Sequence, residues 1–261
     1  MNNYLNIFLL IGLIFFFFYS CNYYDREVIV DKSKLLGNDY RLFQQTEAWE
    51  LAKAVADQNV KQINKLIRED KELIDFQEPV FGQTLLMLTI VNQQFKSFKT
   101  LLENGANVNL YGTYDGSSAL IDACGYDHYD VKYPKLLFQY GANINDLEVG
   151  PRQKRNETRY TPLIAASRAG NIKIVKFLVE NGADVNFQNE YKQSALSKAA
   201  LTGKYDVVYY LLKNGADFRR PVFYREDKDK KIYLEDILNR NTNPSDRKYK
   251  KKIISFLRAN E

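Results

Sequence analysis

The chain has 261 residues and a formal net charge of +5, with 45% hydrophobic and 26% charged residues. This is the composition of a folded protein, and it excludes disorder throughout the chain. The 19 Tyr and 16 Phe are of types that occur both in cores and at binding surfaces, so their number alone decides no function.

The N-terminus carries an uninterrupted apolar run over residues 7–18, and residues 1–20 contain no charged side chain. The run is shorter than the about 20 residues of a transmembrane helix and favours the core of a signal peptide. Phe18-Tyr19-Ser20-Cys21 resembles a bacterial lipoprotein cleavage box, although that family prefers Leu at the position of Phe18 and a basic n-region. We therefore expect a lipoprotein signal peptide over 1–20 and lipidation of Cys21. An uncleaved anchor, an ordinary signal peptide and a buried segment are the alternatives.

After this signal, residues 21–45 are interpreted as a polar tether to a folded domain over 46–260. In the leading interpretations that domain lies outside the cytoplasm, in the cell envelope and facing the periplasm or exterior; the alternative is a freely secreted protein. The second thiol, Cys124, lies in an Ala-Cys-Gly stretch of a predicted helix and is expected to be small and buried. With Cys21 lipidated, no disulfide framework remains.

The domain repeats a short pattern from one unit to the next. Each unit has Thr or Ser before an apolar helix, paired apolar residues in a second helix, and a terminal Gly-Ala. The clearest copies are 158–190 and 191–222, offset by 33 positions, and earlier copies occupy 81–112 and 113–150. A degenerate first repeat is expected over 46–80 and a pair of capping helices over 230–260, because the end units of a repeat array need a polar outer face.

These residues resemble the ankyrin-repeat family, whose unit is a turn, two antiparallel helices and a Gly-Ala-Asp loop in about 33 residues. The resemblance implies an all-α solenoid of about five to six stacked helix-turn-helix units with hairpin-like finger loops. The residue types suit such a unit. Thr161 or Ser194 can cap the first helix, with Pro162 at its first position. Gly182 and Gly215 can end the second helix in a left-handed conformation.

Two insertions interrupt the pattern. The third unit has a longer link at 127–134, in which Pro134 is expected to start the second helix. The connection from Asn145 to Thr161 has 16 residues, against eight from Asn186 to Ser194, and predicts an enlarged finger over 147–159. Long loops in compact domains are commonly functional or disordered, and both interpretations remain open here.

Tyr, Phe and Arg recur near the finger tips, and these are types that dominate interaction hot spots. The partner-binding hypothesis comprises Tyr111, Tyr114, Arg152, Arg155, Phe187, Tyr191, Arg219, Arg220, Phe223 and Tyr224. The alternative is that each aromatic covers its own hairpin or a neighbour. Residues 219–258 carry 13 Lys or Arg and 6 Asp or Glu, which indicates a solvated outer face or contact with anionic lipid or an acidic partner.

Catalytic chemistry has little support. His128 is the single histidine, which argues against His-based metal sites and most nucleophilic triads. Its neighbourhood, Asp127 to Asp130, is interpreted as a solvated turn. There is no phosphate-binding glycine loop, no paired Cys motif and no metalloprotease helix. We expect no catalytic, cofactor-binding or metal-binding residues, although a paired-carboxylate enzyme remains open.

The sequence therefore predicts a non-enzymatic, lipid-anchored module that binds one protein partner through its concave face and finger loops. A monomer is expected. Nucleic acid is disfavoured because no recognised binding motif accompanies the basic residues. An immunity-type or inhibitory protein is the most concrete form of this function. The alternatives are a structural organiser of an envelope complex and a secreted, host-directed effector.

Overall fold

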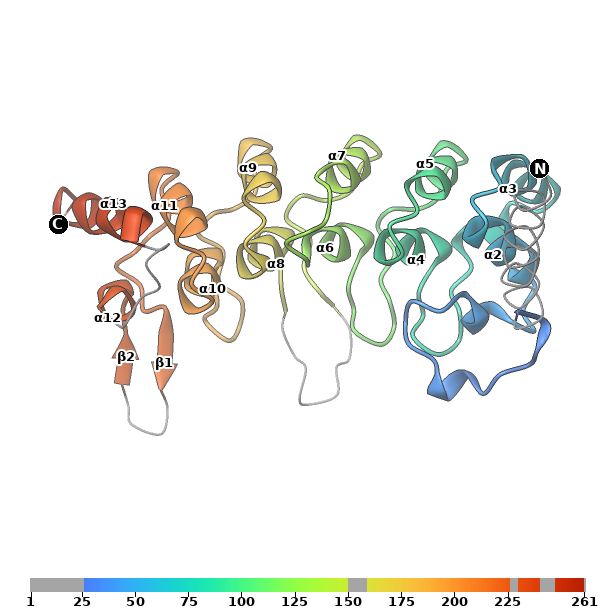
Figure 1. Cartoon of the computed structure of the whole chain (residues 1–261), viewed down its shortest axis with the longest axis horizontal. Helices are drawn as coiled ribbons and strands as arrows, with labels where there is room; N and C mark the ends of the chain where they lie inside the picture. Colours follow the sequence, from blue (N-terminus) through green and yellow to red (C-terminus); the bar gives the residue numbers. More distant parts are fainter. Residues whose placement is uncertain (1–25, 150–158, 226–229, 240–246, 261) are drawn as a thin grey trace, which may run out of the picture.

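The computed structural model describes residues 26–149, 159–225, 230–239 and 247–260. Within these residues six helix pairs follow one another along the chain (Figure 1). They are α2 (Trp49–Ala56) with α3 (Val60–Glu69), α4 (Leu85–Val91) with α5 (Phe95–Glu103), α6 (Ala119–Cys124) with α7 (Lys132–Gln139), α8 (Pro162–Ala169) with α9 (Ile172–Glu180), α10 (Ala195–Leu201) with α11 (Tyr205–Lys213), and α12 (Leu234–Leu238) with α13 (Arg247–Arg258).

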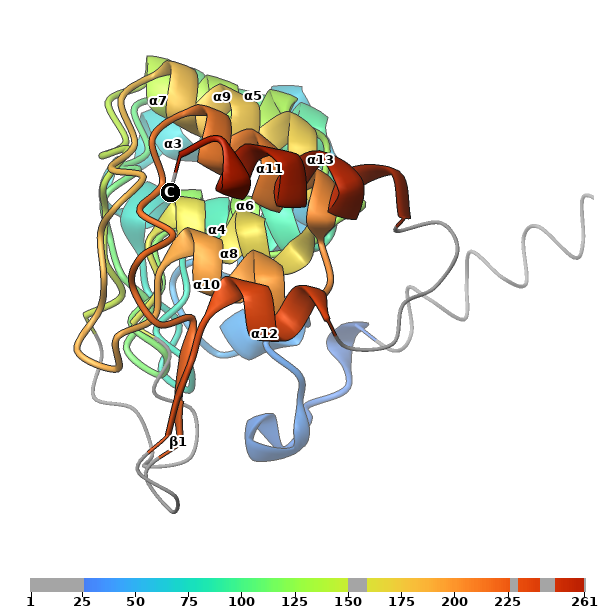
Figure 2. The same cartoon turned by 90° about the vertical axis from the view of Figure 1, so that its left-hand side faces the viewer.

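The pairs stack side by side into an elongated array with two rows of helices. The even-numbered helices form one row, which we call the inner helices, and the odd-numbered helices form the outer row (Figure 1). The loops that join one pair to the next project together on one side (Figure 2). A single apolar core, from Leu42 to Leu257, runs along the array. The expected all-α solenoid is confirmed, and each pair is stabilised by its neighbours.

Local sequence signals determine where the helices begin and end. The Thr161 hydroxyl caps α8 by accepting from the Ile164 amide, with Pro162 at the first helical position. Ser194 caps α10 in the same way and takes part in a capping box with Ser197. Gly182 follows α9 with a φ of 89°, in the left-handed region that favours glycine. These expectations about the repeat unit are confirmed.

Asparagine side chains tie each repeat to the next. The Asn145 amide donates to the Gly182 carbonyl at 3.1 Å, and its oxygen accepts from the Asp184 amide at 2.7 Å. Asn186 repeats the arrangement one unit later, with the Gly215 carbonyl at 2.9 Å and the Asp217 amide at 2.8 Å. The side chain of the Asn that ends a unit thus joins that unit to the backbone of the next.

The third unit differs from the expectation in one detail. Helix α7 begins at Lys132, two residues before Pro134. Proline is compatible with this position because the first N–H groups of a helix have no intrahelical acceptor to lose. The preceding loop is held by Asn171, whose amide lies within hydrogen-bonding distance of the carbonyls of Tyr126, Asp127 and Tyr129.

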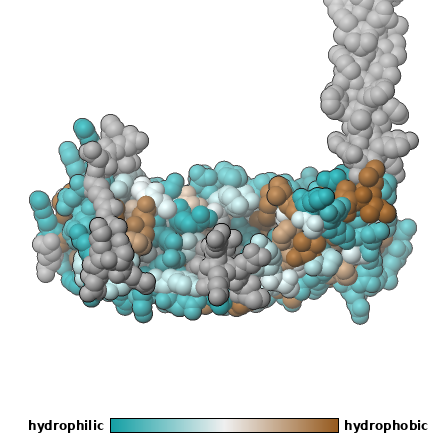
Figure 3. Space-filling view, turned by 90° about the horizontal axis from the view of Figure 1, so that it is seen from below, coloured by the Kyte–Doolittle hydropathy of each residue, from teal (hydrophilic) through white to brown (hydrophobic). Residues whose placement is uncertain are grey.

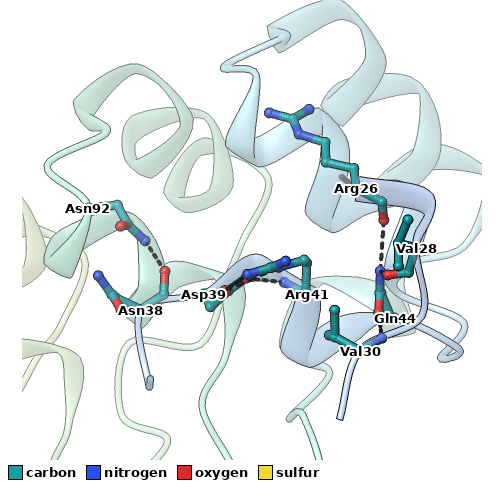
Figure 4. A network of polar contacts seen from close by, with 8 residues as sticks. All are labelled: Arg26, Val28, Val30, Asn38, Asp39, Arg41, Gln44 and Asn92. Atoms are coloured by element: carbon teal, nitrogen blue, oxygen red, sulfur yellow. Dashed lines mark hydrogen bonds and ion pairs between the residues drawn. The ribbon is translucent and has the colours of Figure 1, made fainter. Parts of the chain in front are cut away.

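Residues 26–45 do not form the expected polar tether. They contain two 3₁₀ helices, η1 (Lys32–Lys34) and η2 (Tyr40–Phe43), and the side chains of Leu42 and Phe43 are fully buried. The buried Gln44 amide donates to the carbonyls of Arg26 at 2.7 Å and Val28 at 2.9 Å (Figure 4). Burial of two large apolar side chains explains why this segment packs on the array instead of extending into solvent.

A third 3₁₀ helix and two short strands lie between the helix pairs. The 3₁₀ helix η3 (Glu72–Asp75) leads into the first finger. Strands β1 (Phe223–Arg225) and β2 (Lys230–Ile232) pair antiparallel, with Phe223 opposite Ile232, so the last finger is a β-hairpin, in line with the expected hairpin-like finger loops.

Candidate protein-binding surface

The inner helices and the fingers together form one face of the array, which we call the inner face. It corresponds to the predicted concave surface. Backbone hydrogen bonds join neighbouring fingers: the Tyr114 amide donates to the Phe81 carbonyl and the Val149 amide to the Gly116 carbonyl, both at 3.0 Å. These bonds order the first three fingers relative to one another, which preorganises that part of the face for binding.

Within the first finger, Glu78 is the organising residue. Its side chain is buried, and its carboxylate accepts hydrogen bonds from the amides of Val80, Phe81 and Gln83 at 2.7 to 3.0 Å. Glu78 lies between η3 and α4, outside the cap positions that sequence patterns identify, so its role was not predicted.

Several of the predicted contact aromatics are exposed on the fingers. Tyr114, Tyr191, Phe223 and Tyr224 keep between 41% and 45% of their surface accessible. They belong to three fingers spread along the array. Large aromatic side chains on ordered loops have little conformational entropy to lose on binding, which is why such residues supply binding energy.

Tyr111 and Phe187 lie differently. The Tyr111 hydroxyl donates to the Asp146 carboxylate at 2.6 Å, and Phe187 is partly buried against the apolar core. The hydrogen bond to Asp146, together with burial and the nearby negative charge, raises the pKa of Tyr111 to about 12. For these two residues the geometry matches the alternative that an aromatic covers its own repeat or a neighbour.

The predicted arginines are engaged within the chain where they can be described. Arg219 donates to the Asn260 carbonyl at 2.8 Å, which ties the last finger region to the end of α13. Arg220 forms an ion pair with Asp217 at 3.0 Å. Arg152 and Arg155 lie outside the described residues, as does Cys21.

The N-terminal segment, residues 26–45, lies along the inner helices at the α2–α4 end, on the side away from the outer row (Figures 1 and 2). The Asn92 amide at the end of α4 donates to the Asn38 carbonyl at 2.9 Å (Figure 4). The Tyr40 hydroxyl bonds to Gln94, and Arg26 pairs with Asp57 at 2.6 Å. One end of the inner face is therefore covered by the chain itself.

Within the described chain, residues 26–45 cover the α2–α4 end of the inner face. The inner helices from α6 onward lie beyond this segment. Viewed from the finger side, apolar surface gathers mainly toward the N-terminal end (Figure 3). The segment itself contributes exposed Val28, Ile29 and Leu36. Apolar pairs such as Leu35-Leu36 and Leu42-Phe43 were the sequence signal that this stretch is not a simple tether.

A cationic cluster lies farther along the inner helices. The Tyr160 ring, directly before α8, has the Lys198 Nζ of α10 at 5.1 Å from its centroid and the Arg168 guanidinium of α8 at 5.8 Å. Both distances lie within the range of cation–π attraction. This cluster was not predicted from the sequence, because its residues come from two repeats.

Cys124 and His128 are candidate chemical groups that the structure describes. Burial, with the nearby Asp122 charge, raises the pKa of the Cys124 thiol. Asp127 and His128 are exposed on the link before α7, with 3.3 Å between the Asp127 carboxylate and the His128 Nδ1. His128 packs edge-on against Tyr129, with ring centroids 4.9 Å apart. Among the residues that the structure describes, no group of three or more His, Cys, Asp or Glu could hold a metal ion.

Comparison with known proteins accounts for the repeated geometry. A family model described as ankyrin repeats (3 copies) matches residues 51–148 and 135–221, which is more than half of the chain. The chain belongs to the ankyrin-repeat family. An ankyrin-repeat protein of Borreliella burgdorferi is 27% identical over 126 residues, covering 48% of this chain and 51% of that protein. An ankyrin-repeat protein of Acanthamoeba polyphaga mimivirus, R886, is 38% identical over 64 residues, covering 24% of this chain and 41% of its own.

This ankyrin-repeat chain thus spans about half the length, or less, of the curated relatives it matches. Ankyrin repeats form protein–protein interaction modules and are generally not enzymes. In the described part of the chain, no helix is long and apolar enough to cross a membrane. The apolar run at 7–18 lies outside that part.

Proposed function

We propose that this ankyrin-repeat protein binds one protein partner, as a monomer, through the inner face beyond the N-terminal segment and the neighbouring fingers. The observation that carries the proposal is the set of half-exposed finger aromatics Tyr114, Tyr191 and Tyr224, of which Tyr114 lies on a finger joined to both neighbours by backbone hydrogen bonds. Because the fingers are ordered before binding, association loses less conformational entropy than it would with flexible loops.

The test replaces Tyr114, Tyr191 and Tyr224 by Ala together and measures capture of a partner from the native envelope fraction, followed by its affinity for the purified chain. Loss of binding with a nearly unchanged melting temperature supports the proposal. Tyr140→Ala is the matched control, because Tyr140 is equally exposed but follows an outer helix, α7. Binding that survives the triple substitution, or a triple variant that fails only by unfolding, would remove the finger aromatics from the interface.

The proposed location is the cell envelope, with the chain anchored by a lipid on Cys21. The uncharged apolar run at 7–18 followed by Ser20-Cys21 supports it. Mass spectrometry of the mature N-terminus tests it, and a Cys21→Ala protein with the same processed mass would contradict lipidation.

Within this location we favour an inhibitory or immunity-type role, in which the bound partner is a toxin or enzyme whose activity is occluded. A rigid face that covers a partner's surface suits occlusion. The experiment is to assay the captured partner's activity with and without the protein. Unchanged activity, with several partners bound at once, would favour the structural organiser; recovery of the chain outside the envelope would favour the secreted effector.

A further inference from the structure

The cationic cluster at Tyr160 is built from two repeats and one finger. Tyr160 is buried, and its position is set by Glu148, whose carboxylate accepts from the Tyr160 amide at 2.6 Å and whose own amide donates to the Tyr160 carbonyl at 3.2 Å. The ring is therefore a fixed platform at the start of α8. Arg168 approaches it from α8 and Lys198 from α10.

Neither cation has a carboxylate within ion-pairing distance among the residues that the structure describes. Elsewhere in that part of the chain, cations near acids do pair, as Arg159 does with Glu190 at 3.2 Å and Arg220 with Asp217 at 3.0 Å. Arg168 instead makes one long contact, 3.5 Å, to the Gly125 carbonyl, and it is exposed. Two like charges near one ring repel each other, and a bound anion would lower that electrostatic cost.

We propose that this cluster receives an acidic segment of the protein partner, with Asp or Glu carboxylates bound by Arg168 and Lys198. The inference rests on the proposed function and specifies the chemistry of its partner. Carboxylates fit because the guanidinium offers paired donors in a planar fork and the ammonium adds a point charge. Lys198 is half-buried beside Tyr160, and this partial desolvation strengthens its contact relative to a fully exposed pair.

The position of the cluster favours a protein segment over a lipid surface. The fingers extend past the inner helices on this side of the array (Figure 2). A flat bilayer would meet the finger tips before it reached cations on α8 and α10, whereas an extended or helical polypeptide can lie along the row of inner helices.

The cluster also lies beyond the part of the inner face that residues 26–45 cover. That segment contacts α2 and the end of α4, through residues such as Asn92 and Asp57. A partner segment seated on α8 and α10 would not have to displace it.

The test uses the full chain and a fluorescent octaglutamate peptide, with octaglutamine as the uncharged probe. Fluorescence anisotropy at an ionic strength of about 0.05 M, where screening is weak, should show binding of octaglutamate alone. Replacing Arg168 and Lys198 by Ala should weaken that binding at least about tenfold. Arg168→Gln with Lys198→Gln, which keeps the side-chain stems, should do the same and guards against a folding defect.

The matched control is Lys96→Ala with Lys173→Ala, which removes two exposed charges from the outer helices α5 and α9. Its octaglutamate affinity should stay within about twofold of the parent's. An equal loss in the two double variants would mean nonspecific attraction to a basic protein and would overturn the proposal. So would binding of phosphatidylglycerol vesicles that depends on Arg168 and Lys198.

The outcomes separate this inference from the proposed function. If a protein partner is captured and its affinity is the same for the Arg168→Ala, Lys198→Ala variant, the acidic contact is wrong and the binding function stands. If octaglutamate binds as expected while no protein is captured through the fingers, the proposed protein-binding function is wrong, and carboxylate binding by Arg168 and Lys198 is still supported.

Discussion

Individual buried side chains hold the fingers of this protein, and Glu78 is the clearest case. A buried carboxylate that accepts three backbone N–H bonds satisfies donors that would otherwise be cut off from water. Sequence patterns identify helix caps such as Thr161 because donor and acceptor are three residues apart. They do not identify contacts such as Tyr111 to Asp146, which join residues 35 positions apart.

Glu78→Ala should lower the free energy of unfolding by about 2 to 3 kcal/mol, because it leaves backbone donors of the first finger without an acceptor. Glu78→Gln should lower the free energy of unfolding by less than Glu78→Ala does, because its amide keeps one oxygen that can accept hydrogen bonds. Chemical denaturation measures both, with Glu72→Ala, an exposed neighbour in η3, as the control that should change little. A Glu78→Ala protein as stable as the control would contradict the role assigned to this carboxylate.

The Tyr111 to Asp146 hydrogen bond makes a pH-dependent contribution. Because the folded pKa of Tyr111 is raised to about 12, above the value of about 10 in an unfolded chain, its stabilisation is complete below pH 10. It is lost as the pH rises from about 10 through 12. The stability difference between the parent and Tyr111→Phe should be constant from about pH 7 to 9 and then shrink. A difference that grows with pH would have the wrong sign.

Among the elements, the N-terminal segment over 26–45 departs furthest from the sequence reading. Its composition is polar enough for a tether, yet Leu42 and Phe43 insert fully into the array. The tether prediction was wrong because two apolar side chains in a polar stretch pack against the domain only when a neighbouring surface has room for them. The strands β1 and β2 within the last finger were not predicted, because three-residue strands carry little periodicity.

Phe43→Ala distinguishes a packed segment from a tether. Removing a fully buried Phe leaves a cavity and should lower the free energy of unfolding by about 3 to 5 kcal/mol. Leu36→Ala, in the same segment but 75% exposed, should change it by less than about 0.5 kcal/mol. Thermal or chemical unfolding measures both. Equal, small effects would restore the tether interpretation.

At the scale of the whole molecule, stability passes from one repeat to its neighbour. Ala199 of α10 is fully buried, and α10 packs directly against α8. Small residues at this position let the inner helices approach closely, so the cooperativity of the array depends on such interfaces. The same stacking sets the spacing of the fingers and therefore the shape of the proposed binding surface.

Ala199→Leu should overpack the α8–α10 interface, cost about 1 to 3 kcal/mol and uncouple the C-terminal repeats. Trp49, the single tryptophan, reports on the first repeat by fluorescence, while circular dichroism reports on all helices. The fluorescence and circular dichroism unfolding curves should coincide for the parent. For the variant they should separate, with the loss of helicity preceding the change in Trp49 fluorescence. Ala259→Leu, at an exposed site after α13, should keep them coincident.

The sequence by itself determined the family, the helix pairs and their caps, because each depends on residues within one unit of about 33 and repeats along the chain. Only the tertiary structure showed that residues 26–45 cover one end of the inner face, that the Tyr111 hydroxyl bonds to Asp146, and that Arg168 and Lys198 both approach Tyr160. These features depend on which surfaces the stacked repeats bring together, and a local pattern carries no record of contacts between residues 35 to 54 positions apart.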